Sequence, residues 1–380
     1  MNSIRSMERV LLTATVQSHI CQFHKPLIEM LHQHNCEVHV AARNNLAEKN
    51  GLRLDFADRV YEIPFERSPF HPKNIGAYRR LKSLLNREQY ELIVCNTPVG
   101  GILTRLAARS SRRRGTKVIY IAHGFHFYQG APRKNWLIYY PLEKAMARFC
   151  DTVITINEED DRIAKERFSC DVEHVHGVGV DTERYRPATP EERAEMCSRE
   201  GLSDEDFVVL CTGELNENKN QKTLIAAAAM LRDKLPRLKV LLAGNGPNEQ
   251  TLRDQITAEH LEDTVKLLGY RTDLERVVPA VDVVVSCSRR EGLPLNIVEA
   301  MLCQKPVVAS VNRGHTELVD DGNTGYLLAP EDVAGFADRI FRLSQEPELS
   351  VKMGTAGFEK AQAYTVEAVK REFEKILFGE

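Results

Sequence analysis

Short apolar segments alternate with longer amphipathic ones along this chain, and this alternation limits the folds that it can adopt more than any other feature. In the first half, five segments have the length and composition of strands: 9–14, 37–41, 92–95, 117–121 and 152–156. Several are separated by patterns of helical spacing, and the apolar residues at 118–121 are consecutive, as in parallel strands covered on both faces. The first half is therefore predicted to form a doubly wound parallel sheet.

The same alternation begins again after a polar, turn-rich stretch that ends at 186–190. Further strands are expected at 207–212, 239–243, 265–268, 281–286 and 306–309, with a helix over 222–235 between the first two. A chain of 380 residues also exceeds the length at which one core usually stops growing. We predict an α/β protein with two Rossmann-like domains, 1–185 and 186–363, and a last helix, about 364–380, that packs back on the first domain.

Composition excludes several classes of protein. No apolar run approaches the roughly 18 residues of a membrane span, and the N-terminus lacks the apolar core of a secretory signal. We therefore expect the protein to be cytoplasmic. The nine cysteines contain no C-x-x-C pair, which favours reduced, buried thiols. The histidines between 19 and 34 lack the separated ligand pairs of a structural zinc site, so no metal and no cofactor are expected.

Charge is distributed unevenly along the chain. Residues 1–150 hold 23 Lys and Arg against 11 Asp and Glu, whereas 151–380 hold 28 against 43. A basic half suits an anionic membrane surface, a phosphate-bearing acceptor or nucleic acid. The segment 133–140 places the single tryptophan and two tyrosines among basic residues, as at a membrane interface, although a core helix with a solvated face has the same pattern.

Two carboxylates flank an expected strand-to-helix turn at 291–299. A helix that begins near Leu295 offers N–H groups, such as those of Asn296, Ile297 and Val298, to an anion, and its dipole favours negative charge there. Glu299 is placed to accept hydrogen bonds from ribose hydroxyls, and Glu291 precedes the turn. Both carboxylates could also serve only to cap and solubilise a helix.

This segment resembles the E-x7-E motif of retaining glycosyltransferase family 4, whose fold is called GT-B. Further segments in the same order also resemble that family: 213–219, 242–247, 268–271, 313–319 and 321–325. The resemblance covers most of the second domain. It implies two Rossmann-like domains facing each other across a cleft, with the nucleotide-sugar donor bound by the second domain and the acceptor by the first.

The resemblance also assigns roles to single residues. Glu291 is expected to be catalytic, and the donor is expected to contact Gly213, Lys219, Gly244, Tyr270, Arg271, Leu295, Asn296, Ile297, Val298 and Glu299. One residue departs from the family pattern: Glu214 stands where an arginine is usual. Arg271, Arg289 or Arg290 could replace the missing cation.

In the first domain, His123 lies just beyond the carboxyl end of an expected strand, where doubly wound folds place their sites. The resemblance puts it near the transferred sugar as a second catalytic residue. The loop after the first strand contains no glycine, so it is not a nucleotide fingerprint. Ser18, His19 and His24 are weaker candidates for the acceptor side, and loop histidines bonded to backbone are the alternative.

The resemblance, together with these observations, implies a retaining, metal-independent hexosyl- or N-acetylhexosaminyltransferase. We expect it to use a nucleotide sugar, preferably a UDP-sugar, and a glycan acceptor linked to polyprenyl diphosphate, in polysaccharide biosynthesis. Peripheral contact with an anionic membrane is expected, and nucleic acid is not. The alternatives are another GT-B enzyme, such as a nucleotide-sugar epimerase, and a non-catalytic lipid- or nucleic-acid-binding module.

Overall fold

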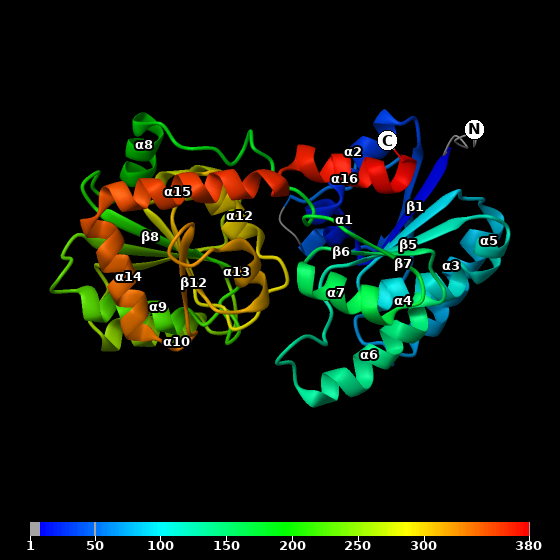
Figure 1. Ribbon diagram of the computed structural model, residues 1–380, viewed down its shortest axis with the longest axis horizontal. Coiled ribbons are helices and arrows are strands. Elements are labelled where there is room, and N and C mark those ends of the chain that lie inside the picture. The colour runs from blue at the N-terminus through cyan, green and yellow to red at the C-terminus, as the bar shows by residue number, and fades with distance from the viewer. Residues whose placement is uncertain (1–7, 49–50, 380) are drawn as a thin grey trace. The chain divides into compact units, whose positions relative to one another are not determined.

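The computed structural model describes residues 8–48 and 51–379 and contains two compact units (Figure 1). Unit 1 comprises 1–179 and 366–380, and unit 2 comprises 180–365. The units divide at 179/180, where the sequence suggested 185/186, because Val180 already pairs with Thr365 at the edge of unit 2. The chain therefore enters and leaves unit 2 at neighbouring points.

Unit 1 is built on a seven-stranded sheet in which every paired strand is parallel. Its strand order is β3-β2-β1-β4-β5-β6-β7, so the order reverses between β1 and β4. The elements are β1 (Arg9–Val16), α1 (Gln17–Phe23), α2 (Lys25–Gln33), β2 (Glu37–Arg43), η1 (Leu46–Glu48), β3 (Arg59–Glu62), α3 (Lys73–Arg87), β4 (Leu92–Asn96), α4 (Pro98–Ala107), α5 (Arg109–Arg113), β5 (Lys117–Ala122), α6 (Arg133–Ala147), β6 (Thr152–Thr155), α7 (Glu158–Arg167), β7 (Asp171–His174) and α16 (Val366–Phe378).

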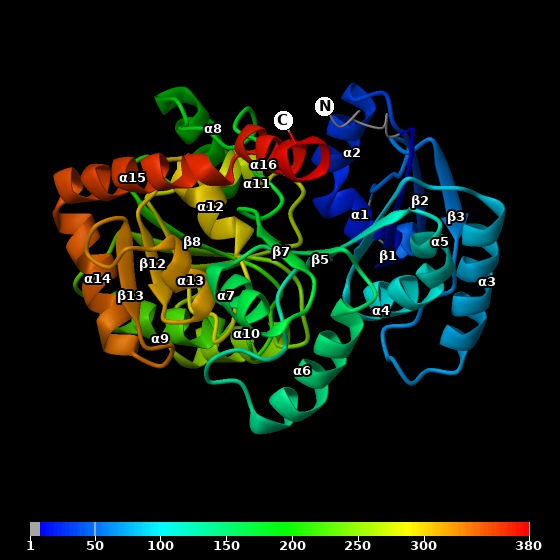
Figure 2. The ribbon, with the colours of Figure 1, turned by 45° about the vertical axis from the view of Figure 1, so that its right-hand side comes forward.

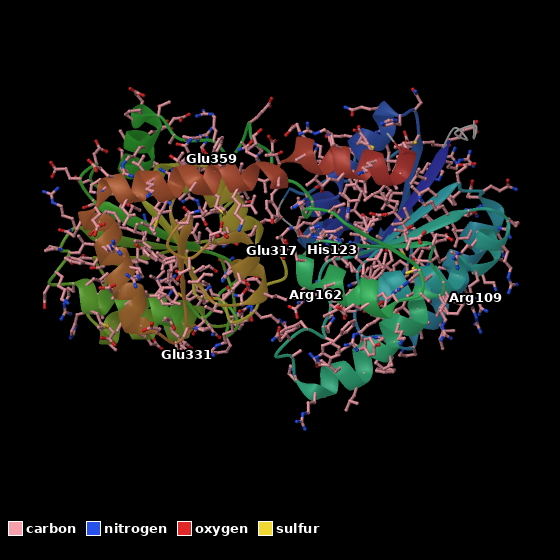
Figure 3. The ribbon with its side chains drawn as sticks, viewed as in Figure 1. Arg109, His123, Arg162, Glu317, Glu331 and Glu359 are labelled. Carbon is pink, nitrogen blue, oxygen red and sulfur yellow. The ribbon has the colours of Figure 1, made fainter. Side chains whose placement is uncertain are left out.

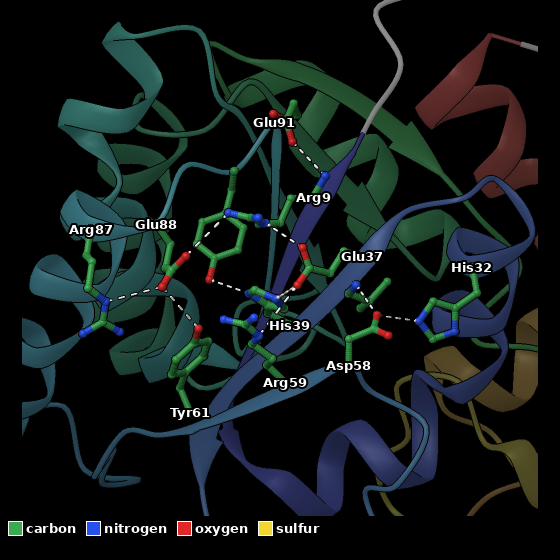
Figure 4. A network of polar contacts seen from close by, with 12 residues as sticks. Arg9, His32, Glu37, His39, Asp58, Arg59, Tyr61, Arg87, Glu88 and Glu91 are labelled. Atoms are coloured by element: carbon green, nitrogen blue, oxygen red, sulfur yellow. Dashed lines mark hydrogen bonds and ion pairs between the residues drawn. The ribbon is translucent and has the colours of Figure 1, made fainter.

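A polar network links the strands at one edge of this sheet (Figure 4). Glu37 on β2 accepts a hydrogen bond from Arg9 Nε (2.9 Å), and its other oxygen lies 2.8 Å from His39 Nε2. His32 on α2 reaches Asp58, with 2.9 Å between Nε2 and Oδ2. These two histidines thus have carboxylate partners within the edge network.

The C-terminal helix α16 lies beside α2 in unit 1 (Figures 1 and 2). It buries Val369, Phe373 and Leu377, and Glu372 accepts hydrogen bonds from the backbone and side-chain nitrogens of His176. This is the unit against which the sequence suggested that the last helix would pack.

Unit 2 repeats the architecture with a six-stranded parallel sheet of order β10-β9-β8-β11-β12-β13, which reverses between β8 and β11. Its elements are α8 (Pro190–Glu200), β8 (Phe207–Thr212), α9 (Gln221–Leu231), β9 (Leu238–Ala243), α10 (Glu249–Ala258), β10 (Val265–Gly269), α11 (Leu274–Val277), η2 (Val278–Ala280), β11 (Val283–Ser286), α12 (Leu295–Leu302), β12 (Val307–Ser310), α13 (Arg313–Leu318), β13 (Gly325–Leu328), α14 (Val333–Gln345), α15 (Pro347–Ala361) and η3 (Gln362–Tyr364).

Alternate residues of the unit 2 strands contribute to two separate cores. Val209 and Val283 pack in the cluster that includes residues of α9, α10 and α14, whereas Val208 and Val284 pack in the cluster that includes residues of α8 and α12. Successive side chains of a strand point to opposite faces, so a sheet covered on both faces must be apolar at consecutive positions. The runs of consecutive apolar residues in the sequence therefore reflect a sheet that is covered by helices on both faces.

All ten strands expected from the sequence are present, with ends that differ by at most two residues. The three unpredicted strands, β3, β7 and β13, have four residues each and lie at sheet edges. Residues 204–206 form a turn before β8, and Asp206 accepts a hydrogen bond from Ser203 N. Within the described residues, no helix is long and apolar enough to cross a membrane.

Candidate functional site

The loops that follow β8 and β11 meet at the point where the strand order of unit 2 reverses. Lys219, from the first loop, places its Nζ 2.7 Å from Oε1 of Glu291, from the second. The Lys219 side chain is 22% exposed and that of Glu291 is 14% exposed, so the pair is largely shielded but still accessible. Doubly wound sheets bind their ligands at the carboxyl ends of strands at such a reversal.

Hydrogen bonds from the backbone and from asparagine side chains hold these two loops together. Arg289 N donates to Asn218 O (2.7 Å), and Asn218 Nδ2 donates to Arg290 O (3.0 Å). Within the first loop, Lys219 N donates to Asn216 Oδ1 (2.9 Å). The Lys219–Glu291 pair is therefore fixed by its supporting loops as well as by its own charges.

Gly213 and Gly244 have backbone conformations that side chains rarely adopt, with φ values of +139° and +150°. A Cβ atom on Gly244 would lie 1.9 Å from the carbonyl oxygen of Gly213. A Cβ on Gly213 would in turn approach the Lys219 side chain at 3.1 Å. Glycine at both positions thus permits the close approach of two loops beneath Lys219.

Helix α12 begins at Leu295, as expected, and its first turn follows the loop that contains Glu291. Its N-cap residue, Pro294, supplies no side-chain hydrogen bond, so no cap competes with an anion for the first N–H groups. Asn296 Nδ2 is buried without a hydrogen-bond partner among the described residues. Ile297 and Val298 are buried against the core, so they can contribute backbone groups but not side chains.

Burial raises the pKa of Glu299 to about 7, with the Tyr185 hydroxyl as its hydrogen-bond partner. The carboxyl group therefore keeps its proton to a higher pH than an exposed glutamate does. Hydrogen bonds from hydroxyl groups to such a buried carboxylate stabilise its charged form and lower its pKa.

The arginines expected to replace the missing phosphate cation are mostly engaged elsewhere. Arg271 forms a bidentate pair with Asp273 (2.7 and 2.8 Å) and donates to Glu200 (2.8 Å). Arg289 pairs with Glu331. Arg290 is exposed, and Glu214 accepts a hydrogen bond from Asn216 (3.0 Å). The geometry therefore gives Arg271 and Arg289 structural roles in this form of the protein, while Tyr270 beside Arg271 is 57% exposed.

His315 is a site residue that the sequence did not single out. It is fully buried on α13, and its Nδ1 lies 2.6 Å from Ser310 O, which requires the proton on Nδ1. Its Nε2 is consequently a bare lone pair, and it has no hydrogen-bond partner among the described residues. Burial lowers its pKa to about 4, and the charges of Glu291 and Lys219 also act on it. The imidazole of His315 is therefore influenced by the charges of Lys219 and Glu291.

In unit 1, His123 (labelled in Figure 3) follows β5 and lies close to Asn96, the last residue of β4, and to His19 on α1. Asn96 Nδ2 donates to Thr13 O (3.3 Å), so its Oδ1 faces the Nε2 of His123 at 3.2 Å. His19 Nε2 lies 3.2 Å from the same nitrogen, and the His24 ring lies 5.2 Å from the His123 ring. The structure therefore brings His123, His19 and His24 together.

Ser18, also suggested for the acceptor side, has a structural partner. Its N–H donates to Asn45 Oδ1 (3.0 Å), and its Oγ accepts from Asn45 Nδ2 (2.9 Å). Ser18 is buried, and both of its polar groups are engaged in this reciprocal pair. Its geometry thus favours fixing the loop after β1 over contacting a ligand.

A cavity of about 370 Å³ lies beside this cluster, with His19, His126 and Tyr120 in its lining. Glu143, also in the lining, pairs with the fully buried Arg105 at 2.8 Å. The Arg105 guanidinium stacks 3.9 Å from the centre of the Tyr120 ring. Unit 1 therefore has a hollow lined by both apolar and polar side chains, as small-molecule sites usually are.

For residues 133–140 the sequence allowed either a membrane-interface segment or a core helix with a solvated face, and helix α6 has features of both. Trp136 and Tyr140 pack against the core of unit 1, whereas Leu137 is 76% exposed and Ile138 is 55% exposed. The aromatic residues at 133–140 thus stabilise the fold, and adjacent aliphatic residues remain on the surface.

Two family models match the chain, one in each unit. The model described as "Glycosyl transferases group 1" matches residues 192–360, and the model described as "Glycosyl transferase 4-like" matches residues 9–157. EpsD of Bacillus subtilis (strain 168), whose name describes it as a glycosyltransferase, is 44% identical over 95% of this chain and 94% of its own length. This chain belongs to glycosyltransferase family 4.

Other relatives of this glycosyltransferase extend the comparison. The Escherichia coli UDP-Gal:alpha-D-GlcNAc-diphosphoundecaprenol alpha-1,3-galactosyltransferase is 27% identical over 81% of each chain. The crystal structure of Anabaena HepE in complex with UDP and glucose matches with a TM-score of 0.80 at 22% identity, covering 98% of this chain and 100% of HepE. The fold is GT-B, as the sequence indicated.

Proposed function

We propose that this glycosyltransferase transfers a hexosyl or N-acetylhexosaminyl group from a UDP-sugar to a glycan hydroxyl, with retention of configuration and without a metal cofactor. The name of the Escherichia coli relative supports a UDP-sugar donor and a diphosphate-linked lipid acceptor, and HepE binds UDP. We further propose a role in the assembly of cell-surface polysaccharide at the inner face of the membrane.

The Lys219–Glu291 pair at the strand reversal is the observation that carries this proposal. Lys219 and the first turn of α12 stabilise the diphosphate as negative charge develops on it, which replaces the charge otherwise supplied by a metal. Glu291 orients the sugar, and His123 donates a hydrogen bond to one of its hydroxyls. The acceptor hydroxyl attacks from the face of the leaving group, and a phosphate oxygen takes its proton.

The acceptor is proposed to bind unit 1 at the 370 Å³ cavity, where His19 and His126 provide polar contacts. A lipid-linked acceptor remains at the membrane surface while its sugar enters the site. The exposed Leu137 and Ile138 on α6, together with the basic residues of that unit, suit contact with anionic lipid.

A thermal-shift and calorimetric panel tests the donor assignment. The purified protein is measured with UDP, GDP, ADP and their common sugars, in EDTA throughout. Because a ligand that binds the folded state raises its apparent stability, UDP and one UDP-sugar are expected to raise the Tm in EDTA. A response that requires added Mg²⁺, or a preference for GDP or ADP, contradicts the donor and metal assignments.

Nucleotide affinity should depend on pH through Glu299. Ribose hydroxyls donate to its carboxylate, so binding favours the charged form of a group whose pKa is about 7 in the free protein. We expect UDP affinity to rise by up to about tenfold from about pH 6 to pH 8 and then to level off. Calorimetry of Glu299→Gln provides the control, since it retains only the ionisation of UDP itself. The same pH dependence in both proteins contradicts the role of Glu299.

His315 is proposed to accept a hydrogen bond from a hydroxyl of the donor sugar through Nε2. One neutral hydrogen bond contributes about 0.5–1.5 kcal/mol, so His315→Gln should raise the KM for the sugar nucleotide about 2- to 10-fold. The affinity for UDP, which lacks the transferred sugar, should stay unchanged. An equal loss of UDP affinity in the variant indicates instead that His315 only supports the fold.

A further inference from the structure

Three histidine side chains converge in unit 1 although the chain separates them by up to 104 positions. His19 lies on α1, His24 lies between α1 and α2, and His123 follows β5. One potential ligand atom from each lies within 4.8 Å of the others, and the Nε2 atoms of His19 and His123 are 3.2 Å apart. Two nitrogens bound at about 2.1 Å to a tetrahedral Zn²⁺ are about 3.4 Å apart, which is close to the spacing of the His19 and His123 nitrogens.

The protein alone leaves this cluster incompletely satisfied. His24 is 1% exposed, and its Nε2 has no hydrogen-bond partner among the described residues. Its ring centre lies 5.3 Å from that of His19 and 5.2 Å from that of His123. A buried polar nitrogen without a hydrogen-bond partner is costly, so the position of His24 beside two other imidazoles favours a bound group at this place.

The side chains of the cluster are of a type that suits metal binding. Imidazole is a common ligand of zinc-class ions and binds them through a ring nitrogen. His19 also lines the 370 Å³ cavity, which provides a path by which an ion can enter.

We propose that His19, His24 and His123 bind one divalent ion of the zinc class, with water in the fourth position. Neutral imidazole favours Zn²⁺, Cu²⁺, Ni²⁺ and Co²⁺ over Mg²⁺ and Ca²⁺, which prefer oxygen ligands. This site is not the cofactor of transfer. On the proposed function, His123 contacts the transferred sugar, so an ion bound to its ring removes that contact and inhibits transfer.

Binding is tested without reference to activity. Untagged protein is freed of metal with chelator, the chelator is removed, and Zn²⁺ is titrated by calorimetry, with Co²⁺ as a spectroscopic probe and Mg²⁺ as a comparison. We expect one equivalent of Zn²⁺ to bind, and the visible Co²⁺ spectrum to show tetrahedral nitrogen coordination. The absence of saturable one-to-one binding, or equal binding of Mg²⁺, overturns the proposal.

Single substitutions identify the ligands. His19→Gln and His24→Gln should each weaken Zn²⁺ binding at least tenfold, whereas His32→Gln should bind as the unaltered protein does. His32 is the matched control because it lies on the neighbouring α2 and pairs with Asp58 outside the cluster (Figure 4). His24 is buried, so its variant could unfold. The decisive variant is therefore that of the partly exposed His19. If the His19→Gln protein is folded and binds Zn²⁺ as tightly as the unaltered protein, the proposed metal site is wrong.

Inhibition of transfer is a separate measurement. Zn²⁺ should inhibit turnover over the same concentration range in which it binds, and EDTA should restore it. If Zn²⁺ binds but turnover does not change, the metal site is supported. The proposed inhibition, which rests on the proposed role of His123, is then wrong. Failure of Zn²⁺ to bind, with UDP-dependent transfer intact, overturns the metal site and leaves the proposed function standing.

Discussion

Glu291→Gln is expected to lower kcat by about 100-fold or more while leaving the fold and UDP affinity nearly unchanged. The substitution keeps the size of the side chain but removes the charge that lies 2.7 Å from Lys219 Nζ. A group that stabilises the transition state through fixed electrostatics commonly contributes a factor of about 10²–10³. Steady-state kinetics with the UDP-sugar identified in the thermal-shift panel measures this loss.

The matched control for this variant is Glu359→Gln on α15, an exposed carboxylate of the same unit (Figure 3). It should transfer sugar at the rate of the unaltered protein. A Glu291→Gln protein with the same kcat as this control contradicts the role assigned to Glu291. A loss of UDP affinity equal to the loss of turnover assigns Glu291 to binding and not to the reaction.

The sequence predicted the two parallel sheets because strands that are buried on both faces are apolar at consecutive positions. Edge strands have a weaker sequence pattern. β3 is exposed at three of its four positions, and β7 alternates between exposed and half-buried residues. Their pairing is decided by backbone hydrogen bonds to a neighbouring strand, which short polar segments do not reveal.

The sequence pointed to several segments of the candidate site but not to their arrangement. Lys219 and Glu291 both stood in recognisable segments, yet their ion pair depends on the strand order that brings the loops after β8 and β11 together. The convergence of His24 with His123 depends in the same way on the ends of β1 and β5. Spacing in the sequence could not distinguish a contact across the sheet from a distant pair.

Arg271 has carboxylate partners that compete with its predicted contact to the donor, and this contact stays a prediction. A guanidinium two residues from Asp273 can pair with it locally, and the chain places Glu200 against its remaining nitrogens. With two carboxylates already bound, Arg271 would have to break charged hydrogen bonds to reach a phosphate. The local partner was visible in the sequence, but Glu200, 71 positions away, was not.

Lys219→Ala is expected to weaken UDP binding by about 10- to 100-fold. A hydrogen bond to a charged group contributes about 1.5–3 kcal/mol, and the ammonium group has three donors, so it can hold Glu291 and a phosphate oxygen together. Calorimetry with UDP in EDTA measures the effect. Lys222→Ala is the matched control, because Lys222 is exposed on α9 three residues away and should leave UDP affinity unchanged.

A double-substitution cycle separates the two possible roles of Lys219. If Lys219 only neutralises Glu291, replacing it in the Glu291→Gln background should cost no UDP affinity, because no charge remains to be neutralised. If it contacts the diphosphate, the loss should persist in that background at about 10-fold or more. We expect the second result, since the Gly213–Gly244 contact beneath the side chain and the uncapped start of α12 create a place for phosphate whether or not Glu291 is charged.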